Sequence, residues 1–195
     1  HVSGLLLAGD TLDVFVCHFP SRSGGAKESE SYRLYAAHIL RMEVDSIMSI
    51  RSLPQVIIMG DFNDYPTNQS IQKILEAEAP PVTTNNLAST TGSTNFSTVA
   101  PSSLKLYHLL ARKAKSKDFG SYKYRGEWGL LDHLIVSGSL LNSANSFSTS
   151  ENKATVSNLP FLLTEDKKYG DKEPFRTYKG CLLYTSPSPR DLSTS

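Results

Sequence analysis

The feature that most constrains this chain is an apolar run that leads directly into a polar loop. Residues Gln55–Met59 are mostly aliphatic, and Gly60–Asp64 follows without a break. Such a run, bounded by glycine, predicts a strand covered on both faces, as found inside α/β sheets. Ligands collect at the carboxyl ends of these strands, so the acids and the amide there predict a site for a cation or a donor. The structural alternative is an Asx turn, in which Asp61 or Asn63 bonds to nearby backbone groups.

Length and charge limit the kinds of protein that this chain can be. Its 195 residues fit one domain, and its 39% hydrophobic and 20% charged content is typical of a globular chain. The net charge of +1 provides no broad field for a nucleic-acid backbone, so any such binding would be local. No apolar run approaches the ~20 residues of a membrane-spanning helix. Nothing in the composition indicates an obligate protein partner.

The last residues differ in composition from the rest of the chain. Residues 181–195 are rich in Ser, Thr and Pro, as solvated segments are. They also resemble the translated adaptor sequence that contaminates metagenomic assemblies. We therefore expect residues 1–180 to belong to the folded domain, and residues 181–195 to be a non-native or disordered tail. Without the tail only Cys17 remains, which says nothing about the redox compartment.

The hydrophobic pattern predicts a strand–helix–strand unit. Strands over Thr11–Phe19 and Gln55–Met59 flank a helix over Glu28–Arg51, an order typical of α/β crossover units. The apolar stripe expected on this helix comprises Tyr32, Tyr35, Ala36, Ile39, Leu40, Val44, Ile47 and Met48. The other expected elements are strands at Val2–Leu7, Tyr122–Arg125 and Leu130–Ser137, helices at Asn68–Ala77 and Leu104–Lys115, a surface loop over Val82–Ser103, and loop with short strands from Asn142 to Gly180.

Polar residues stand at or near the ends of three of these strands. His18 closes the first, Asp61 and Asn63 follow the second, and Asp132 lies in the third, shortly after Trp128. Taken singly, a histidine or aspartate in such a place is more often structural than catalytic. Strand ends of an α/β chain converge in space, however, so four such residues together favour one shared site.

Three segments in this order resemble the endonuclease/exonuclease/phosphatase superfamily: His18–Arg22, Gly60–Asp64 and Trp128–Ser137. That superfamily includes pancreatic-type deoxyribonucleases, apurinic/apyrimidinic endonucleases, neutral sphingomyelinases and inositol polyphosphate 5-phosphatases. The resemblance implies an α/β fold, a four-layer sandwich of two packed mixed β-sheets flanked by helices. It also implies hydrolysis of a phosphoester, in a nucleic acid or another substrate, by an activated water assisted by Mg²⁺ or Mn²⁺.

The resemblance assigns a role to each matching residue. Asp61 would orient and deprotonate the attacking water and bind the metal. Asn63 would contact the phosphoryl oxygen or help Asp61 to hold the metal. His18 would donate to the phosphate, and Asp132 would orient a second histidine. The residues expected to contact the substrate are Ser21, Arg22 and Trp128.

The chain also departs from the superfamily pattern. Members carry a metal-binding Glu before the segment that matches His18–Arg22, and a terminal Ser-Asp-His whose histidine pairs with the residue matching Asp132. Neither occurs here, and His133 cannot substitute because adjacent strand residues point to opposite faces. We therefore expect the C-terminal portion of one domain, incomplete and inactive as written. Two alternatives remain: a phosphatase acting on lipid or inositol phosphates, and a non-catalytic binding relic of the same fold.

Overall fold

The computed structural model of the protein describes residues 1–82 and 101–175. Most of the predicted loop over Val82–Ser103 and the whole predicted tail lie outside these residues. The elements, in chain order, are β1 (Val2–Leu5), β2 (Thr11–His18), α1 (Glu30–Ile50), β3 (Gln55–Asp61), the π-helical turn η1 (Ser70–Ile74), β4 (Leu106–His108), the 3₁₀ turn η2 (Lys113–Lys115), β5 (Tyr122–Tyr124), β6 (Glu127–Gly129), β7 (Asp132–Ser137), the 3₁₀ turns η3 (Gly138–Leu141), η4 (Glu151–Lys153) and η5 (Pro160–Leu162), β8 (Leu163–Glu165) and β9 (Lys172–Pro174).

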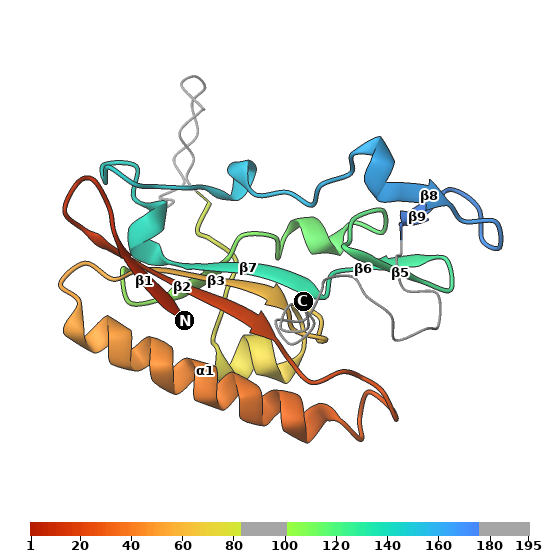
Figure 1. Ribbon diagram of the computed structural model, residues 1–195, viewed down its shortest axis with the longest axis horizontal. Helices are drawn as coiled ribbons and strands as arrows, with labels where there is room; N and C mark the ends of the chain where they lie inside the picture. Colours follow the sequence, from red (N-terminus) through yellow and green to blue (C-terminus); the bar gives the residue numbers. More distant parts are fainter. Residues whose placement is uncertain (83–100, 176–195) are drawn as a thin grey trace, which may run out of the picture.

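A mixed five-stranded sheet, in the order β1-β2-β3-β7-β4, forms the centre of the molecule (Figure 1). Strands β2 and β3 are parallel and joined through α1, which confirms the predicted crossover unit. Strand β7 runs antiparallel between β3 and β4, and β1 adds an antiparallel edge. Two small two-stranded sheets, β5–β6 and β8–β9, accompany the large one. The predicted α/β sandwich class is confirmed.

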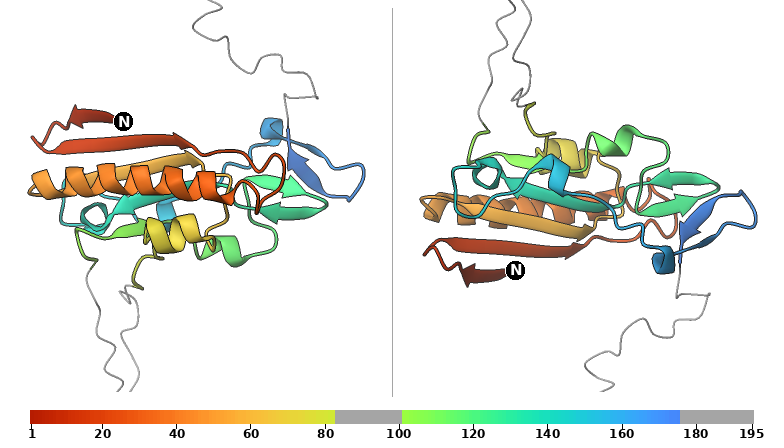
Figure 2. Two further views of the ribbon diagram at one scale, coloured as in Figure 1. Left: turned by 90° about the horizontal axis from the view of Figure 1, so that it is seen from below. Right: turned by 90° about the horizontal axis from the view of Figure 1, so that it is seen from above.

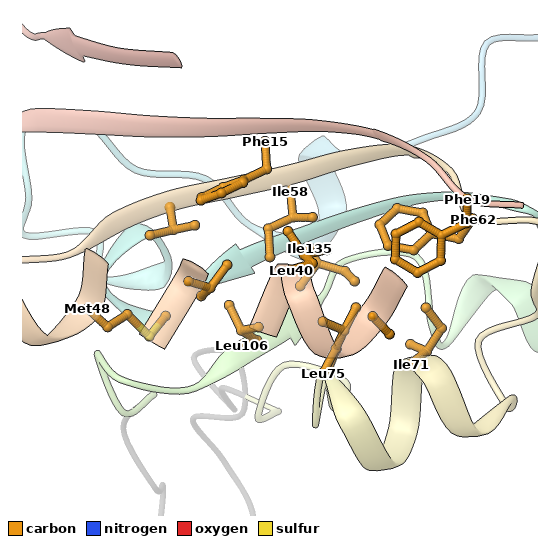
Figure 3. Packing of buried hydrophobic residues seen from close by; sticks show 14 residues of the cluster. Phe15, Phe19, Leu40, Met48, Ile58, Phe62, Ile71, Leu75, Leu106 and Ile135 are labelled. Atoms are coloured by element: carbon orange, nitrogen blue, oxygen red, sulfur yellow. The ribbon is translucent and has the colours of Figure 1, made fainter. Parts of the chain in front are cut away.

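Helix α1 covers one face of the sheet because its buried side chains recur every three or four residues. They meet the strand residues that point down from β2, β3 and β7, and η1 closes the same layer (Figure 3). The apolar side chains of this core include Phe15, Leu40, Val44, Met48, Val56, Ile58, Ile71, Leu75, Leu106 and Ile135.

The predicted stripe on α1 was partly wrong. Tyr32 and Tyr35 are 66% and 69% exposed, and Ile39 is also exposed. The buried stripe runs instead through Arg33, which is 2% exposed, and Ala37. A buried acidic partner on the loop after β3 holds Arg33, and this rotates the tyrosines toward solvent.

The opposite face of the sheet is covered over only part of its width. A second core, built mainly from Tyr107, Leu109, Val136 and Leu140, covers β4, β7 and the adjoining side of β3. Figure 2 shows the segment after β7 running over this face. Leu12 at the start of β2 still packs against the second core, but the later part of β2 lies outside its cover. Val16 on β2 is accordingly 74% exposed. The sheet therefore has one closed face, under α1, and one partly open face.

The helix predicted at Leu104–Lys115 was wrong. Residues Leu106–His108 form β4, and only Lys113–Lys115 is helical, as a single 3₁₀ turn. The edge of β7 supplies the hydrogen-bonding partner for β4. Leu106 and Tyr107 then enter the cores on opposite faces, a period-two arrangement that a helix cannot give.

The other predicted elements are present with shorter bounds, except β3, which extends two residues beyond the predicted Gln55–Met59 to Asp61. The predicted helix at Asn68–Ala77 is reduced to η1, and the weakly patterned region after Asn142 contains 3₁₀ turns with β8 and β9. Strand β6 was not predicted. It pairs with β5 across a two-residue turn, Arg125-Gly126, with φ of 51° and 86°, as in tight hairpins. Within the described residues no helix has the length and apolarity needed to cross a membrane.

Candidate active site

Three of the predicted site residues lie in one row across the sheet. His18 is opposite Asp61 in the parallel register of β2 and β3, and Asp61 is opposite Asp132 in the antiparallel register of β3 and β7. Partners in register point to the same side of a sheet, and here that side is the partly open face. His18 and Asp132 are exposed and Asp61 is half-buried. The structure thus brings together residues that are far apart in the chain.

Asp61 stands at the centre of this row and has two different neighbours. Its Oδ1 accepts the backbone N–H of Asn63 at 2.8 Å, so the Asx turn considered as an alternative is present. Its Oδ2 lies 4.0 Å from Nε2 of His18. Burial raises the pKa of Asp61, and the charge of Asp132 adds to this, while the Asn63 N–H, His18 and Arg22 act in the opposite direction. The turn occupies one oxygen and leaves the other facing His18.

Gly60 allows β2 and β3 to approach closely just before the row. Its φ is 133°, a conformation that side chains rarely adopt, and a Cβ would collide with the backbone of Cys17. Cys17 and Gly60 are register partners, immediately before His18 and Asp61. The spacing within the row therefore depends on this glycine.

Asn63 joins the end of β3 to the end of β2. Its Nδ2 donates to the carbonyl oxygen of Phe19 at 3.0 Å, and its φ of 49° turns the chain sharply. In the described part of the chain no donor contacts the side-chain oxygen of Asn63. That oxygen remains able to bind a metal or a phosphate-bound group.

Arg22, predicted to contact substrate, is engaged with the loop after β3. Its Nε donates to the carbonyl oxygen of Asn63 at 2.6 Å, and its Nη2 lies 3.6 Å from Oδ1 of Asp64. Its guanidinium carbon lies 4.4 Å from the centre of the Tyr65 ring. Ser21 is exposed and accepts a backbone N–H from Ser23. Arg22 therefore fastens the loop.

Trp128 lies on β6, beside the loop rather than in the row. It is half-buried and lines a cavity of about 1020 Å³ together with Tyr65 and Thr67. Nζ of Lys123 lies 5.8 Å from the centre of its ring. Trp128 thus lines a cavity that neither His18 nor Asp61 lines, and its contact with substrate stays a prediction.

A buried ion pair beneath the loop was missed from the sequence. Asp64 is 1% exposed, its Oδ1 accepts Nε of Arg33 at 2.8 Å, and its Oδ2 accepts the hydroxyl of Ser70 at 2.7 Å. Nη1 of Arg33 also donates to Ser29. One signal was available: Arg33 precedes Ala37 and Leu40 at helical spacing, so a charge stands in line with the core.

Two buried histidines were also missed. His133 points away from Asp132, as predicted, and its Nε2 bonds to the carbonyl oxygen of Asp64 at 2.8 Å. Its Nδ1 bonds to Nε2 of His108, whose Nδ1 accepts the backbone N–H of Leu110 at 3.1 Å. Burial lowers the pKa of His133 to about 4 and that of His108 to about 3, so both rings are neutral at pH 7. No sequence pattern links two histidines 25 positions apart.

The oxygen atoms around Asp61 suit a hard divalent cation. Asp61 and Asp132 are adjacent carboxylates, and Asn63 adds an amide oxygen. Among the described residues, no group of three or more His, Cys, Asp or Glu side chains is arranged to hold a metal. Mg²⁺ at phosphoryl-transfer sites is usually bound by one or two carboxylates together with water and substrate phosphate. The residues present fit that mode of binding and do not fit a cage of protein ligands.

A comparison of the sequence with protein-family models agrees with this arrangement. The model described as the endonuclease/exonuclease/phosphatase family matches residues 1–189, nearly the whole chain. No curated protein and no solved structure gives a match. The match includes every residue of the row and of the loop that follows β3. The chain therefore belongs to the endonuclease/exonuclease/phosphatase family.

Proposed function

We propose that this protein is a divalent-cation-dependent phosphodiesterase of the nuclease type, in which Asp61 activates the attacking water. The family comprises phosphoester-hydrolysing nucleases and phosphatases. The observation that carries the proposal is the position of Asp61 between His18 and Asp132 on the partly open face of the sheet. A carboxylate with a raised pKa is a stronger base, and a base at the end of a buried strand can hold a water in a fixed direction.

Each neighbour of Asp61 has a role that its chemistry suits. His18, with Nε2 4.0 Å from Asp61, would donate to a phosphoryl oxygen on which negative charge develops. The free oxygen of Asn63 would orient the cation or a phosphate-bound water. A divalent cation bound beside Asp61 would neutralise charge on the phosphoryl oxygens. The rate then depends mainly on positioning, which the fixed loop supports.

Asp132 supports a second candidate, a binding module without turnover. In this family the matching carboxylate is expected to orient a histidine. Among the described residues, however, only Ser121 bonds to Asp132 through its side chain, and its hydroxyl accepts the backbone N–H and does not contact the carboxylate. Without that histidine, protonation of the leaving group would be slow. A site that binds a cation and phosphate but releases no product would fit the same geometry.

The test uses bis(p-nitrophenyl) phosphate, because its nitrophenolate leaving group needs no proton donor. The full chain is assayed with Mg²⁺ or Mn²⁺, beside Asp61→Asn and the control Asp45→Asn. Asp45 is exposed on α1, which covers the other face of the sheet. From the sequence we expect the chain to be inactive towards ordinary phosphoesters, but this activated diester should still be hydrolysed slowly. We expect that slow, cation-dependent hydrolysis in the wild type and in Asp45→Asn, reduced by about 10²–10⁴ in Asp61→Asn.

Binding measured in parallel separates the two candidates. Free Mn²⁺ is followed by electron paramagnetic resonance in the presence of inorganic phosphate. Binding that requires Asp61, without any hydrolysis, selects the binding module. Hydrolysis of equal rate in the wild type and Asp61→Asn contradicts the proposal altogether.

A further inference from the structure

The loop that carries Asp61 is held from beneath by a hydrogen-bonded chain through two buried side chains. The chain starts at the backbone N–H of Leu110, passes through His108 on β4 and His133 on β7, and ends at the carbonyl oxygen of Asp64. His108 and His133 are 0% and 3% exposed. The hydrogen-bonded chain therefore connects β4, at the edge of the sheet, to the loop after β3.

The two ends of this hydrogen-bonded chain determine which nitrogen of each ring carries the proton. A backbone N–H only donates, so Nδ1 of His108 must accept and the proton of that ring lies on Nε2. That proton is donated to Nδ1 of His133, which places the proton of His133 on Nε2. A carbonyl oxygen only accepts, so Nε2 of His133 donates to Asp64. Both rings are neutral and both carry the proton on Nε2, which agrees with their lowered pKa values.

His133 contacts the loop at two points. Besides its bond to Asp64, the ring packs edge-on against Phe62, with 5.0 Å between ring centres. Phe62 follows Asp61 directly and is fully buried. His133 is also the register partner of Gly60. One imidazole thus contacts residues on both sides of Asn63, from the sheet face opposite to the row.

We propose that His133 is a positioning residue for Asp61, and that His108 holds His133 in the tautomer required for this. The inference rests on the proposed function, because it concerns the direction in which Asp61 faces. Arg33 and Ser70 hold the carboxylate of Asp64, whereas His133 holds its backbone carbonyl. Losing the backbone anchor lets Asn63 and the Asx turn shift, so the Asp61 carboxylate loses its fixed direction.

Substitutions of His133 test the positioning role. His133→Phe keeps the packing against Phe62 and removes the donor, whereas His133→Gln retains an N–H that can reach Asp64. The control is His38→Phe, because His38 is exposed on α1. We expect kcat for the activated diester, and Mn²⁺ affinity, to fall about 10-fold in His133→Phe, with KM little changed. His133→Gln should recover most of both losses, and His38→Phe should lose neither.

His108 provides a second arm. His108→Phe leaves His133 able to donate but frees its tautomer, so a smaller loss of kcat is expected than in His133→Phe. Because both act through one chain, the double variant should be no worse than His133→Phe alone. Losses that add independently would overturn the proposed chain.

The tautomers can be measured without any turnover. Long-range ¹H–¹⁵N correlation spectra of the wild type at pH 7 should show His108 and His133 both with the proton on Nε2, with assignment from the Phe variants. The opposite tautomer on either ring overturns the inference even if Asp61→Asn abolishes hydrolysis. A folded His133→Phe protein with unchanged kcat and Mn²⁺ affinity overturns the inference as well.

If His133→Phe fails to fold, the tautomers and the His133→Gln variant decide. A folded His133→Gln protein that shows the tenfold loss contradicts the role of the donor. Failure of the proposed function appears separately, as hydrolysis insensitive to Asp61→Asn.

Discussion

Asp61 and Asp132 occupy partner positions on β3 and β7, so that two carboxylates stand side by side at the partly open face of the sheet. Like charges at such a position oppose ionisation, and the charge of Asp132 contributes to the raised pKa of Asp61. A cation held by these carboxylates, or a proton on one of them, would relieve this repulsion. The pair therefore links cation binding to pH.

The first prediction concerns this pair. Asp132→Asn removes one charge, so the pKa of Asp61 should fall toward its ordinary value. Asp61 would then be ionised at lower pH, and the acidic limb of Mn²⁺ binding should move to lower pH while affinity at neutral pH weakens. Titrating Mn²⁺ binding between pH 4 and 8 measures the shift. An acidic limb that does not move would show that burial alone sets the pKa of Asp61.

The second prediction concerns activity against stability. The pKa of Asp61 is higher in the folded protein than in the unfolded chain. Asp61 therefore makes folding less favourable as pH rises above the pKa that this carboxyl has in the unfolded chain. Asp61→Asn should therefore raise Tm at pH 7 while it removes activity. Thermal melts and rates of the wild type and Asp61→Asn check both effects, and a lower Tm in Asp61→Asn would contradict the assignment.

His18→Ala and Asn63→Ala should each reduce activity by about 10²–10³, as removal of preorganised contacts does. Rates of the two variants measured beside the wild type check this loss.

The third prediction concerns Arg33. Arg33→Met leaves the buried carboxylate of Asp64 without its main partner, which should lower the free energy of unfolding by about 3–5 kcal/mol. Arg41→Met is the matched control, since Arg41 lies on the same helix with Asp45, whose side chain is 53% exposed. It should lose less than about 1 kcal/mol. Urea denaturation of the two variants gives the comparison. Equal losses in the free energy of unfolding would mean that the buried ion pair stabilises the protein no more than the exposed one.

The fourth prediction concerns Gly60. Gly60→Ala must relieve a collision with Cys17 at an unfavourable φ, which should destabilise the protein by about 3 kcal/mol or more and separate His18 from Asp61. Gly4→Ala, on the edge strand β1 with nothing within 4 Å of the new Cβ, should change stability little. Urea denaturation and Mn²⁺ binding test the two consequences separately. A stable Gly60→Ala protein that binds Mn²⁺ normally would disprove the role given to this glycine.

The fifth prediction concerns acid. In the unfolded chain His108 and His133 take up protons near pH 6.5, whereas burial keeps them neutral in the folded protein down to about pH 4. Folding stability should therefore be complete above pH 6.5 and fall progressively as pH decreases toward 4, by several kcal/mol for the pair. Tm measured across this range checks the loss. His108→Phe, which has one such group fewer, should show a shallower decline, and an identical slope would contradict this origin.

The strand–helix–strand unit and the row could be predicted because their signals are local. Apolar runs that end in His18 and Asp61 mark the carboxyl ends of β2 and β3, and a parallel crossover places those ends together. The third member, Asp132, was found as a polar residue in the strand predicted at Leu130–Ser137, and the resemblance to the family then gave it a role. Each of these inferences needs only the residues of one segment and a rule for joining segments.

The missed features depend on tertiary pairing. Residues 104–115 have an apolar pattern that also suits a helix, and only the available edge of β7 makes β4 a strand. The rotation of α1 depends on Asp64, which lies on another element, so Tyr32 and Tyr35 were placed inside. The bond between His108 and His133 joins strands that no spacing rule connects.

The three residues of the row come from the three inner strands of a five-stranded sheet. No contiguous piece of the chain contains the row unless it spans from β2 to β7, because β2, β3 and β7 follow one another at long intervals. Pairings between such distant segments form late and slowly during folding. Ion binding at Asp61 would then be among the last properties to return on refolding. It could therefore report completion of the sheet, whereas fluorescence or helix content would recover before the sheet is complete.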